Sequence, residues 1–94
     1  MKVLHLTLKK KWFDMILSGQ KREEYREIKP YWNKRLSKSY DAIKFRNGYS
    51  KTSPAMLVAL EGIYTGLGII EHGAPQEKPV YILKLGEIIA EYQK

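Results

Sequence analysis

The sequence contains no cysteine and no long run of hydrophobic residues. Without cysteine, a disulfide framework, a thiolate zinc site and a cysteine nucleophile are all excluded. The apolar start from Val3 to Leu8 is too short to be the core of a secretory signal and far too short to span a bilayer. These absences predict a cytoplasmic protein that is stabilised by ordinary burial of apolar groups and has no membrane partner.

Acidic residues are scarce in the first half of the chain. Residues 1–51 carry 14 of the 17 Lys and Arg residues and only five acidic residues, a net charge of +9, whereas residues 52–94 carry −2. A local basic surface favours a polyanionic partner, nucleic acid above all, because each cation that contacts a phosphate releases condensed counterions. A basic face that serves only solubility is the alternative.

The 94 residues are enough for one domain with a single core, and 44% of them are hydrophobic. Period-two alternation predicts strands at residues 3–8, 21–28 and 40–46, the most apolar stretch predicts a central strand at 55–64, and a last strand is expected at 80–85. Helices are predicted at 9–18, at 29–36 with Pro30 in the first turn, and at the C-terminal segment 86–94. Asn47-Gly48 predicts a tight turn. Five strands with short helices between some of them predict an α+β fold, a small mixed or antiparallel β-barrel decorated by helices.

Residues 19–32 concentrate basic residues, three carboxylates and three aromatic residues in one stretch. Gly19 suits the left-handed position that ends a helix. In the strand after it, alternation is expected to place Arg22, Glu24 and Arg26 on one face and Lys21, Glu23 and Tyr25 on the other. Neither face is apolar enough to be a simple core face, so one of them is predicted to line a charged cleft. An edge strand kept soluble by its charges is the alternative.

Tyr31 and Trp32 are adjacent in the second predicted helix, so a helix cannot bury both equally. We expect one of them to cover the core and the other to offer a stacking platform for a base. Packing of both rings at the core and its rim is the alternative.

Residues 19–26, Gly-Gln-Lys-Arg-Glu-Glu-Tyr-Arg, follow an amphipathic helix and resemble the signature of the ASCH domain family of the PUA-like superfamily. The family pattern is a helix and then Gly-x-Lys-Thr-x-Glu-x-Arg, which the chain matches at Gly19, Lys21, Glu24 and Arg26. The likeness extends through Tyr31-Trp32 to a closing strand at residues 81–86, so it covers nearly all of a single domain, residues 1–94. The resemblance implies a PUA-like β-barrel whose cleft binds RNA or nucleotides. The implied binding residues are Gly19, Lys21, Arg22, Glu24, Arg26, Tyr31 and Trp32.

Some members of this family are enzymes: small bacterial ones hydrolyse the amide of N4-acetylcytidine, and others have been described as ribonucleases. The working residues of the amidohydrolase type are a lysine, a threonine and a glutamate. Lys21 matches the lysine, Glu24 stands where that type has threonine, and Arg22 replaces the threonine of the general motif. A glutamate at this place would act as a base toward water, with Lys21 neutralising the oxyanion.

Lys21 and Glu24 are therefore the candidate catalytic residues of a hydrolase. Glu61 or Glu71 is a candidate second carboxylate, and His5 or His72 a possible helper. Two histidines without cysteine show no metal-ligand spacing, so neither a metal nor a cofactor is expected. A third interpretation is structural: the charged strand forms an internal salt-bridge network in a partner-binding adaptor.

Overall fold

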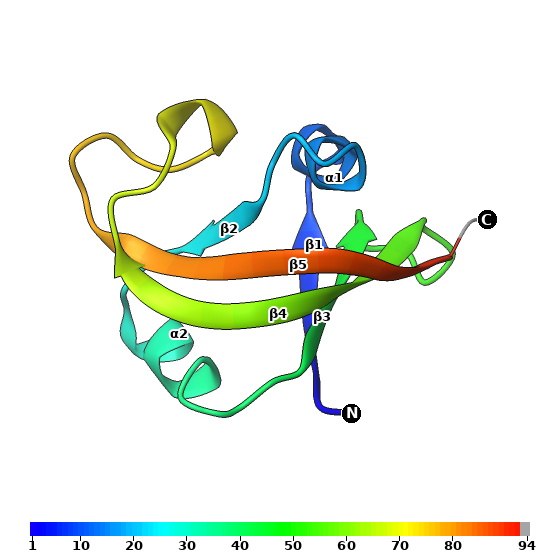
Figure 1. Ribbon diagram of the computed structural model, residues 1–94, viewed down its shortest axis with the longest axis horizontal. Coiled ribbons are helices and arrows are strands. Elements are labelled where there is room, and N and C mark those ends of the chain that lie inside the picture. Colours follow the sequence, from blue (N-terminus) through cyan, green and yellow to red (C-terminus); the bar gives the residue numbers. More distant parts are fainter. Residues whose placement is uncertain (93–94) are drawn as a thin grey trace.

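A single mixed sheet organises the fold, and the computed structural model describes residues 1–92 of the chain (Figure 1). Five strands lie in the order β1-β3-β4-β5-β2, with β1 parallel to β3 and the other neighbours antiparallel. The elements follow the chain as β1 (Val3–Leu8), α1 (Lys10–Leu17), β2 (Glu23–Arg26), α2 (Pro30–Arg35), β3 (Ala42–Asn47), β4 (Ala55–Gly66), the 3₁₀ turn η1 (Ile70–His72) and β5 (Val80–Tyr92). The prediction of an α+β fold with five strands and short helices is confirmed.

The prediction of a closed barrel is wrong. The sheet curves strongly along β4 and β5 (Figure 1), but within residues 1–92 no strand pairing joins β1 to β2. Both therefore remain edge strands. The physical reason lies in β2, which has only four residues and directs a charged side chain into the gap: Nη2 of Arg26 donates to the carbonyl oxygen of Thr7 on β1 at 3.4 Å. A side chain, and not a strand ladder, bridges the two edges.

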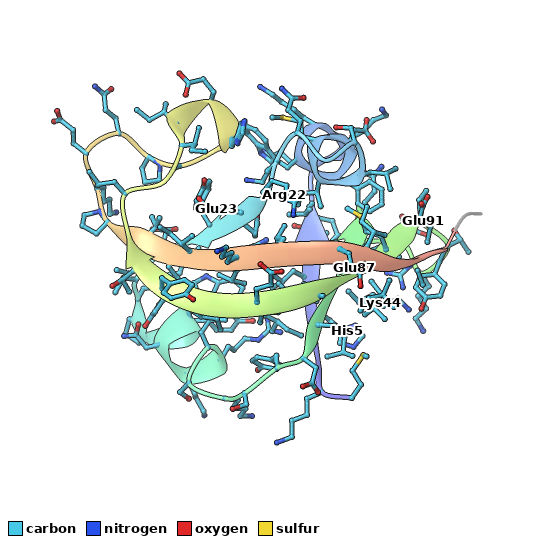
Figure 2. The ribbon with its side chains drawn as sticks, in the orientation of Figure 1. His5, Arg22, Glu23, Lys44, Glu87 and Glu91 are labelled. Atoms are coloured by element: carbon cyan, nitrogen blue, oxygen red, sulfur yellow. The ribbon has the colours of Figure 1, made fainter. Side chains whose placement is uncertain are left out.

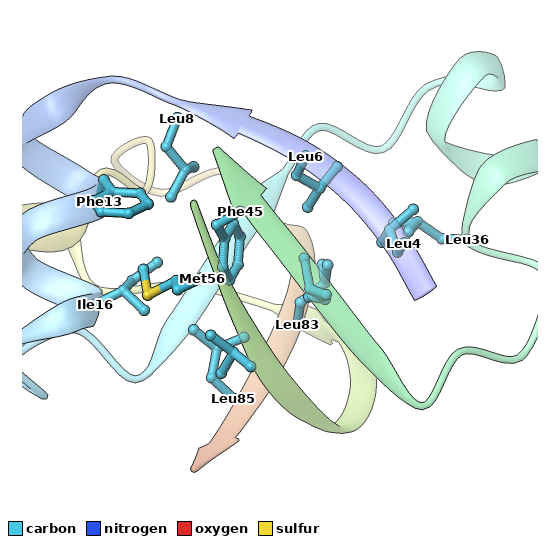
Figure 3. Packing of buried hydrophobic residues seen from close by; sticks show 12 residues of the cluster. Leu4, Leu6, Leu8, Phe13, Ile16, Leu36, Phe45, Met56, Leu83 and Leu85 are labelled. Atoms are coloured by element: carbon cyan, nitrogen blue, oxygen red, sulfur yellow. The ribbon is translucent and has the colours of Figure 1, made fainter. Parts of the chain in front are cut away.

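The core lies on the inner side of this curved sheet, under α1. Leu4, Leu6 and Leu8 of β1 are all buried, as the alternation predicts, because successive side chains of a strand point to opposite faces. They pack with residues from α1, the end of α2 and the three central strands (Figure 3): Phe13, Ile16, Leu36, Ile43, Phe45, Met56, Val58, Leu83 and Leu85.

The first helix and its end agree with the sequence. Phe13 and Ile16 are buried, and Trp12 and Leu17 pack against the same core cluster. Gly19 has φ +86°, the left-handed conformation that favours glycine after a helix. The second helix also begins at Pro30 as expected, and no residue of it is fully buried.

Three local predictions are wrong. Residues 86–92 continue β5 and do not form a helix, because they pair with the first residues of β4, Ala55 to Val58; residues 93–94 lie outside the described part. Asn47-Gly48 is not a tight turn, since Asn47 still belongs to β3 and residues 48–54 form a longer loop. The amide of Asn47 closes this loop by donating a hydrogen bond to the carbonyl oxygen of Pro54. The strand expected at 21–28 contains only Glu23–Arg26.

Helices are short throughout the described chain. None in residues 1–92 has the length and apolar character needed to cross a membrane.

Candidate binding cleft

A cleft of about 740 Å³ opens where the sheet fails to close, between the edge strands β1 and β2. Its walls come from four segments: residues 7–12 at the end of β1 and the start of α1, residues 21–27 in and around β2, residues 47–49 at the end of β3 and just after it, and His72-Gly73 at the end of η1. Because these segments are far apart in the sequence, only the tertiary structure assembles the cleft.

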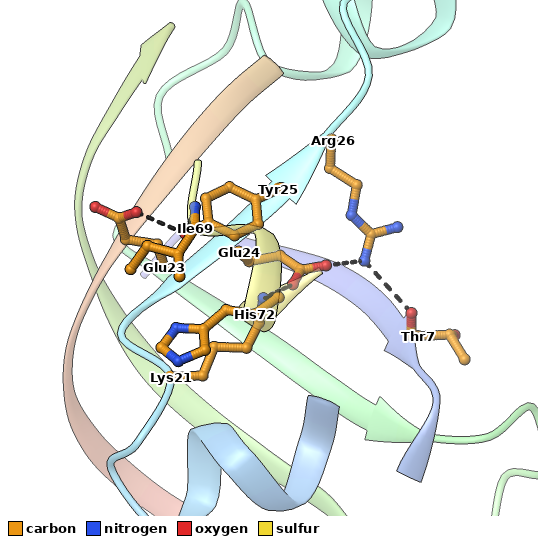
Figure 4. A network of polar contacts seen from close by, with 8 residues as sticks. All are labelled: Thr7, Lys21, Glu23, Glu24, Tyr25, Arg26, Ile69 and His72. Atoms are coloured by element: carbon orange, nitrogen blue, oxygen red, sulfur yellow. Dashed lines mark hydrogen bonds and ion pairs between the residues drawn. The ribbon is translucent and has the colours of Figure 1, made fainter. Parts of the chain in front are cut away.

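Three charged side chains meet in this cleft, and we call Lys21, Glu24 and Arg26 the charged triad (Figure 4). The carboxylate of Glu24 lies in the middle. Its Oε1 is 3.4 Å from Nζ of Lys21, and its Oε2 accepts a hydrogen bond of 2.6 Å from Nη2 of Arg26. Exposed fractions of 2% for Lys21 and 6% for Glu24 show that these ions are held together out of bulk water. Such a buried arrangement is tolerated only where each charge has a partner.

Lys21 lies against Glu24 and not on the opposite face of the strand, which corrects the expected alternation. The residue precedes β2, so its side chain is free of the strand's two-residue period. Nζ donates to the carbonyl oxygen of His72 and lies 4.5 Å from the ring centroid of Tyr25 and 5.2 Å from that of Trp12. Burial lowers the pKa of Lys21 from its ordinary value of 10.5, and the charge of Glu24 opposes part of that shift.

The guanidinium of Arg26 is fixed by two acceptors and a ring. Nη2 is bonded to Glu24 and to the carbonyl of Thr7, and the ring centroid of Trp32 lies 5.0 Å from the central carbon. Its Nε is buried and has no hydrogen-bond partner within residues 1–92, and the same holds for Nδ1 of His72. Both atoms belong to residues that line the cleft. A buried polar atom without a partner in the protein costs free energy, which makes these two atoms the least satisfied polar groups of the cleft walls.

Tyr25 anchors residues 67–79, the connection between β4 and β5 that also contacts Lys21. Its hydroxyl donates to Oε1 of Glu23 at 2.8 Å and accepts from the amide of Ile69 at 3.1 Å (Figure 4). Burial and the nearby carboxylate of Glu23 raise the pKa of Tyr25 to about 12. Gly68 is required here, because a Cβ at that position would lie 2.5 Å from the Tyr25 ring. The anchor places His72, three residues after Ile69, where its carbonyl meets Lys21.

The structure brings together only part of the predicted site. Lys21, Glu24 and Arg26 line the cleft, whereas Gly19 and Arg22 line a smaller hollow of about 220 Å³ beside Gly86. That second hollow shares only Lys21 with the cleft.

The predicted stacking residues lie outside the cleft. Tyr31 is 58% exposed and contacts Trp32 edge to face, with ring centroids 4.9 Å apart. Trp32 packs against the core and against Arg26. Trp32 thus covers the core as expected of one of the two rings, whereas the stacking of a base on the other ring stays a prediction.

Of the further histidines and glutamates proposed from the sequence, one lines the cleft and the others do not. His72 lines the cleft. His5 is exposed, and its partner across the ladder is Lys44 on β3 (Figure 2). Glu61 lines a third hollow beside Leu36, and Glu71 is exposed and does not line the cleft. Neither is therefore placed as a second carboxylate for the triad.

Sequence reasoning missed two aromatic residues of the cleft, Trp12 and Tyr49. Trp12 lies on the apolar face of α1, so the sequence pattern predicts only its contact with the core. In the structure it also lines the cleft. Tyr49 is 94% exposed in the loop after β3 and still lines the cleft. An aromatic residue in a polar loop was the one available signal for Tyr49, since no burial requirement explains it.

The described residues offer no metal site. No group of three or more His, Cys, Asp or Glu side chains in residues 1–92 lies close enough together to hold a metal ion. No family model, curated protein or solved structure matches this chain. The resemblance to the ASCH family therefore rests on the motif residues Gly19, Lys21, Glu24 and Arg26.

Proposed function

We propose that the chain is an RNA- or nucleotide-binding module of the ASCH type, and that the cleft beside β2 receives a base. The observation that carries the proposal is the charged triad, a buried set of donors and acceptors in a cleft whose walls also contain aromatic rings. Recognition of unpaired bases in RNA typically combines hydrogen bonds to the base edge with stacking on an aromatic side chain. A cytoplasmic location, as expected from the lack of cysteine, is compatible with such a partner.

The contacts divide between the floor of the cleft and its rim. On the floor, Glu24 accepts from a ring N–H or amino group, while Lys21 and Arg26 donate to base carbonyl oxygens. Trp12 or Tyr49 stacks on the base, in place of Tyr31 and Trp32, because the former pair line the cleft. At the rim, Lys9 and Lys10 are exposed and meet the phosphate backbone.

Binding should accordingly weaken as salt rises, and the rim lysines should set part of the slope. Titrations of short single-stranded RNAs at several salt concentrations test this. The double variant Lys9→Gln with Lys10→Gln should bind every sequence more weakly and lower the salt slope by roughly 1.4, about 0.7 for each phosphate that is no longer neutralised. Lys78→Gln with Lys84→Gln removes the same charge from exposed positions outside the cleft and serves as the matched control. An unchanged slope in the rim variant, or no binding to any RNA or nucleotide, would refute the proposal.

Hydrolysis of a modified nucleoside or of RNA is the second candidate function. The observation that favours it is the lowered pKa of Lys21 directly beside a carboxylate, since perturbed ionisable groups cluster at catalytic sites. In an amidohydrolase of this design, Glu24 takes a proton from water and the resulting hydroxide attacks the acetyl carbonyl of N4-acetylcytidine. Lys21 stabilises the oxyanion of the tetrahedral intermediate, and Glu24 returns its proton to N4 as the C–N4 bond breaks, so that cytidine and acetate are the products.

Acetate release from N4-acetylcytidine, and cleavage of short RNAs, are the direct measurements. Turnover by the native chain that Lys21→Met abolishes would establish the hydrolase, with Lys78→Met as the control of equal charge change. If the native chain binds these ligands without turnover, the binding module stands alone.

A further inference from the structure

The order of donors and acceptors along the charged triad specifies more than a generic base. Lys21 lies on one side of the Glu24 carboxylate and Arg26 on the other, each against a different oxygen (Figure 4). Lys and Arg can only donate hydrogen bonds, and an ionised carboxylate can only accept them. Across the cleft, the triad therefore presents a donor, an acceptor and a donor.

Each member of the triad keeps some hydrogen-bonding capacity for a ligand. Lys21 has three N–H groups and directs two of them at protein acceptors, the His72 carbonyl and Glu24, which leaves the third for a ligand. Arg26 bonds to protein through Nη2, and within residues 1–92 its Nη1 makes no hydrogen bond. Each oxygen of Glu24 contacts one cation and has two lone pairs.

We propose that the cleft selects bases with a uracil-type imide edge; this inference rests on the nucleotide-binding function proposed above. An imide presents a carbonyl oxygen, a ring N–H and a second carbonyl oxygen, which is the complement of donor, acceptor, donor. The two carbonyl oxygens face Lys21 and Arg26, and the N–H faces Glu24. All three contacts are then hydrogen bonds to charged groups, the stronger kind.

The other common bases each leave a mismatch. Cytosine and adenine direct a ring nitrogen acceptor at the carboxylate of Glu24. Guanine satisfies the carboxylate, but its amino group meets one of the two cations, donor against donor. A site built from buried polar groups rejects a ligand that leaves them unpaired far better than an apolar pocket rejects an extra methyl group.

The decisive ligands are uridine monophosphate, its N3-methyl derivative and cytidine monophosphate, with binding to the native chain followed by calorimetry. Methylation at N3 removes the central donor and leaves both carbonyls in place. We expect uridine monophosphate to bind at least about tenfold more tightly than either of the others. Equal affinity for uridine monophosphate and its N3-methyl derivative would overturn the inference, and no variant protein is needed for that comparison.

Single-stranded RNA separates this inference from the proposed function. Tighter binding of oligouridylate than of oligocytidylate at one salt concentration supports both. Equal binding of the two overturns the base selection and leaves RNA binding in place, whereas no binding of either refutes both.

Variants then assign the selection to the triad. Glu24→Gln should bring the ratio of uridine to cytidine affinity close to one, because the amide offers one acceptor and one donor in place of two acceptors. Glu61→Gln is the matched control, an exposed glutamate on β4 outside the cleft, and should keep the native ratio. A folded Glu24→Gln protein that retained the native ratio would overturn the assignment.

Discussion

The two edge strands of the sheet, β1 and β2, face the same gap with opposite chemistry. β1 sends three leucines inward, and all of them join the core cluster. β2 places Glu24 and Arg26 at the cleft, and these side chains are held by each other, by Lys21 and by the carbonyl of Thr7. Apolar burial stabilises in proportion to the area removed from water, whereas a buried ion network roughly balances its desolvation cost. We infer that β1 mainly stabilises the fold, whereas β2 supplies the charged groups of the cleft.

The largest expected effect comes from the apolar edge. Leu4→Ala should lower the free energy of unfolding by about 3 kcal/mol, because it removes a side chain that is 1% exposed and leaves a cavity in the core. Val3→Ala on the outward face of the same strand is the control and should cost much less. Denaturant unfolding measures both, and equal losses would contradict the inward assignment of Leu4.

The second largest loss of stability is expected for Glu24, the central carboxylate of the charged triad. Glu24→Ala should lower the free energy of unfolding by about 2 kcal/mol, because Lys21 is left buried without its carboxylate and Arg26 loses its shortest hydrogen bond. This is less than the roughly 3–5 kcal/mol of a fully buried pair, since the Arg26 side chain is 19% exposed and keeps contact with water. Glu27→Ala is the control, since its side chain is 61% exposed and, among residues 1–92, pairs with Lys29 alone. If Glu24→Ala proved as stable as the native chain, the triad would not be a mutually dependent network.

A smaller effect is expected when the buried cation is replaced by an apolar group of similar shape. Lys21→Met should change the free energy of unfolding by roughly 1 kcal/mol or less at neutral pH, because removal of the ion pair and relief of the desolvation cost oppose each other. The pH dependence sharpens this prediction. Because the folded pKa of Lys21 lies below 10.5, the unfolded chain binds an additional proton in the window between the two pKa values.

Native stability relative to Lys21→Met should therefore rise as pH increases through that window toward 10.5. Denaturant unfolding of both proteins at a series of pH values gives the difference directly. A difference that fell with pH over this range would contradict the direction of the Lys21 shift.

An effect of similar size at neutral pH is expected for Tyr25→Phe, about 1 kcal/mol for removal of the hydroxyl and its hydrogen bonds. The effect of pH has the opposite sign to that of Lys21. An unfolded tyrosine loses its proton near 10 while folded Tyr25 keeps it to about 12, so this contribution to stability is present below pH 10 and is lost between 10 and 12.

Ultraviolet absorbance of tyrosinate in the folded protein follows the same event. The native chain should show one late-titrating phenol that Tyr25→Phe removes. If the two titration curves coincide, the Tyr25 hydroxyl is not enclosed as described.

Prediction from sequence succeeded where the signal was local. The leucines of β1, the apolar face of α1 and the proline at the start of α2 follow from backbone periodicity and from the fixed φ of proline. It failed for residues 86–92, where a glycine and two glutamates weaken the strand pattern and only pairing with β4 determines the conformation. Prediction from sequence also placed Lys21 and Glu24 on different faces of one strand, because it extended the alternation beyond the four residues that form β2.

By itself, the sequence determined the strands β1, β3 and β4, the helices α1 and α2, and the identity of the three charged residues in one short motif. Only the tertiary structure decided that the sheet stays open, that Trp12 and Tyr49 reach the cleft, and that Lys21 meets the carbonyl of His72, 51 residues away. The physical reason is the range of the forces. Periodicity is imposed by the backbone within a few residues, whereas the cleft depends on long-range packing whose loop-closure entropy the whole core must offset.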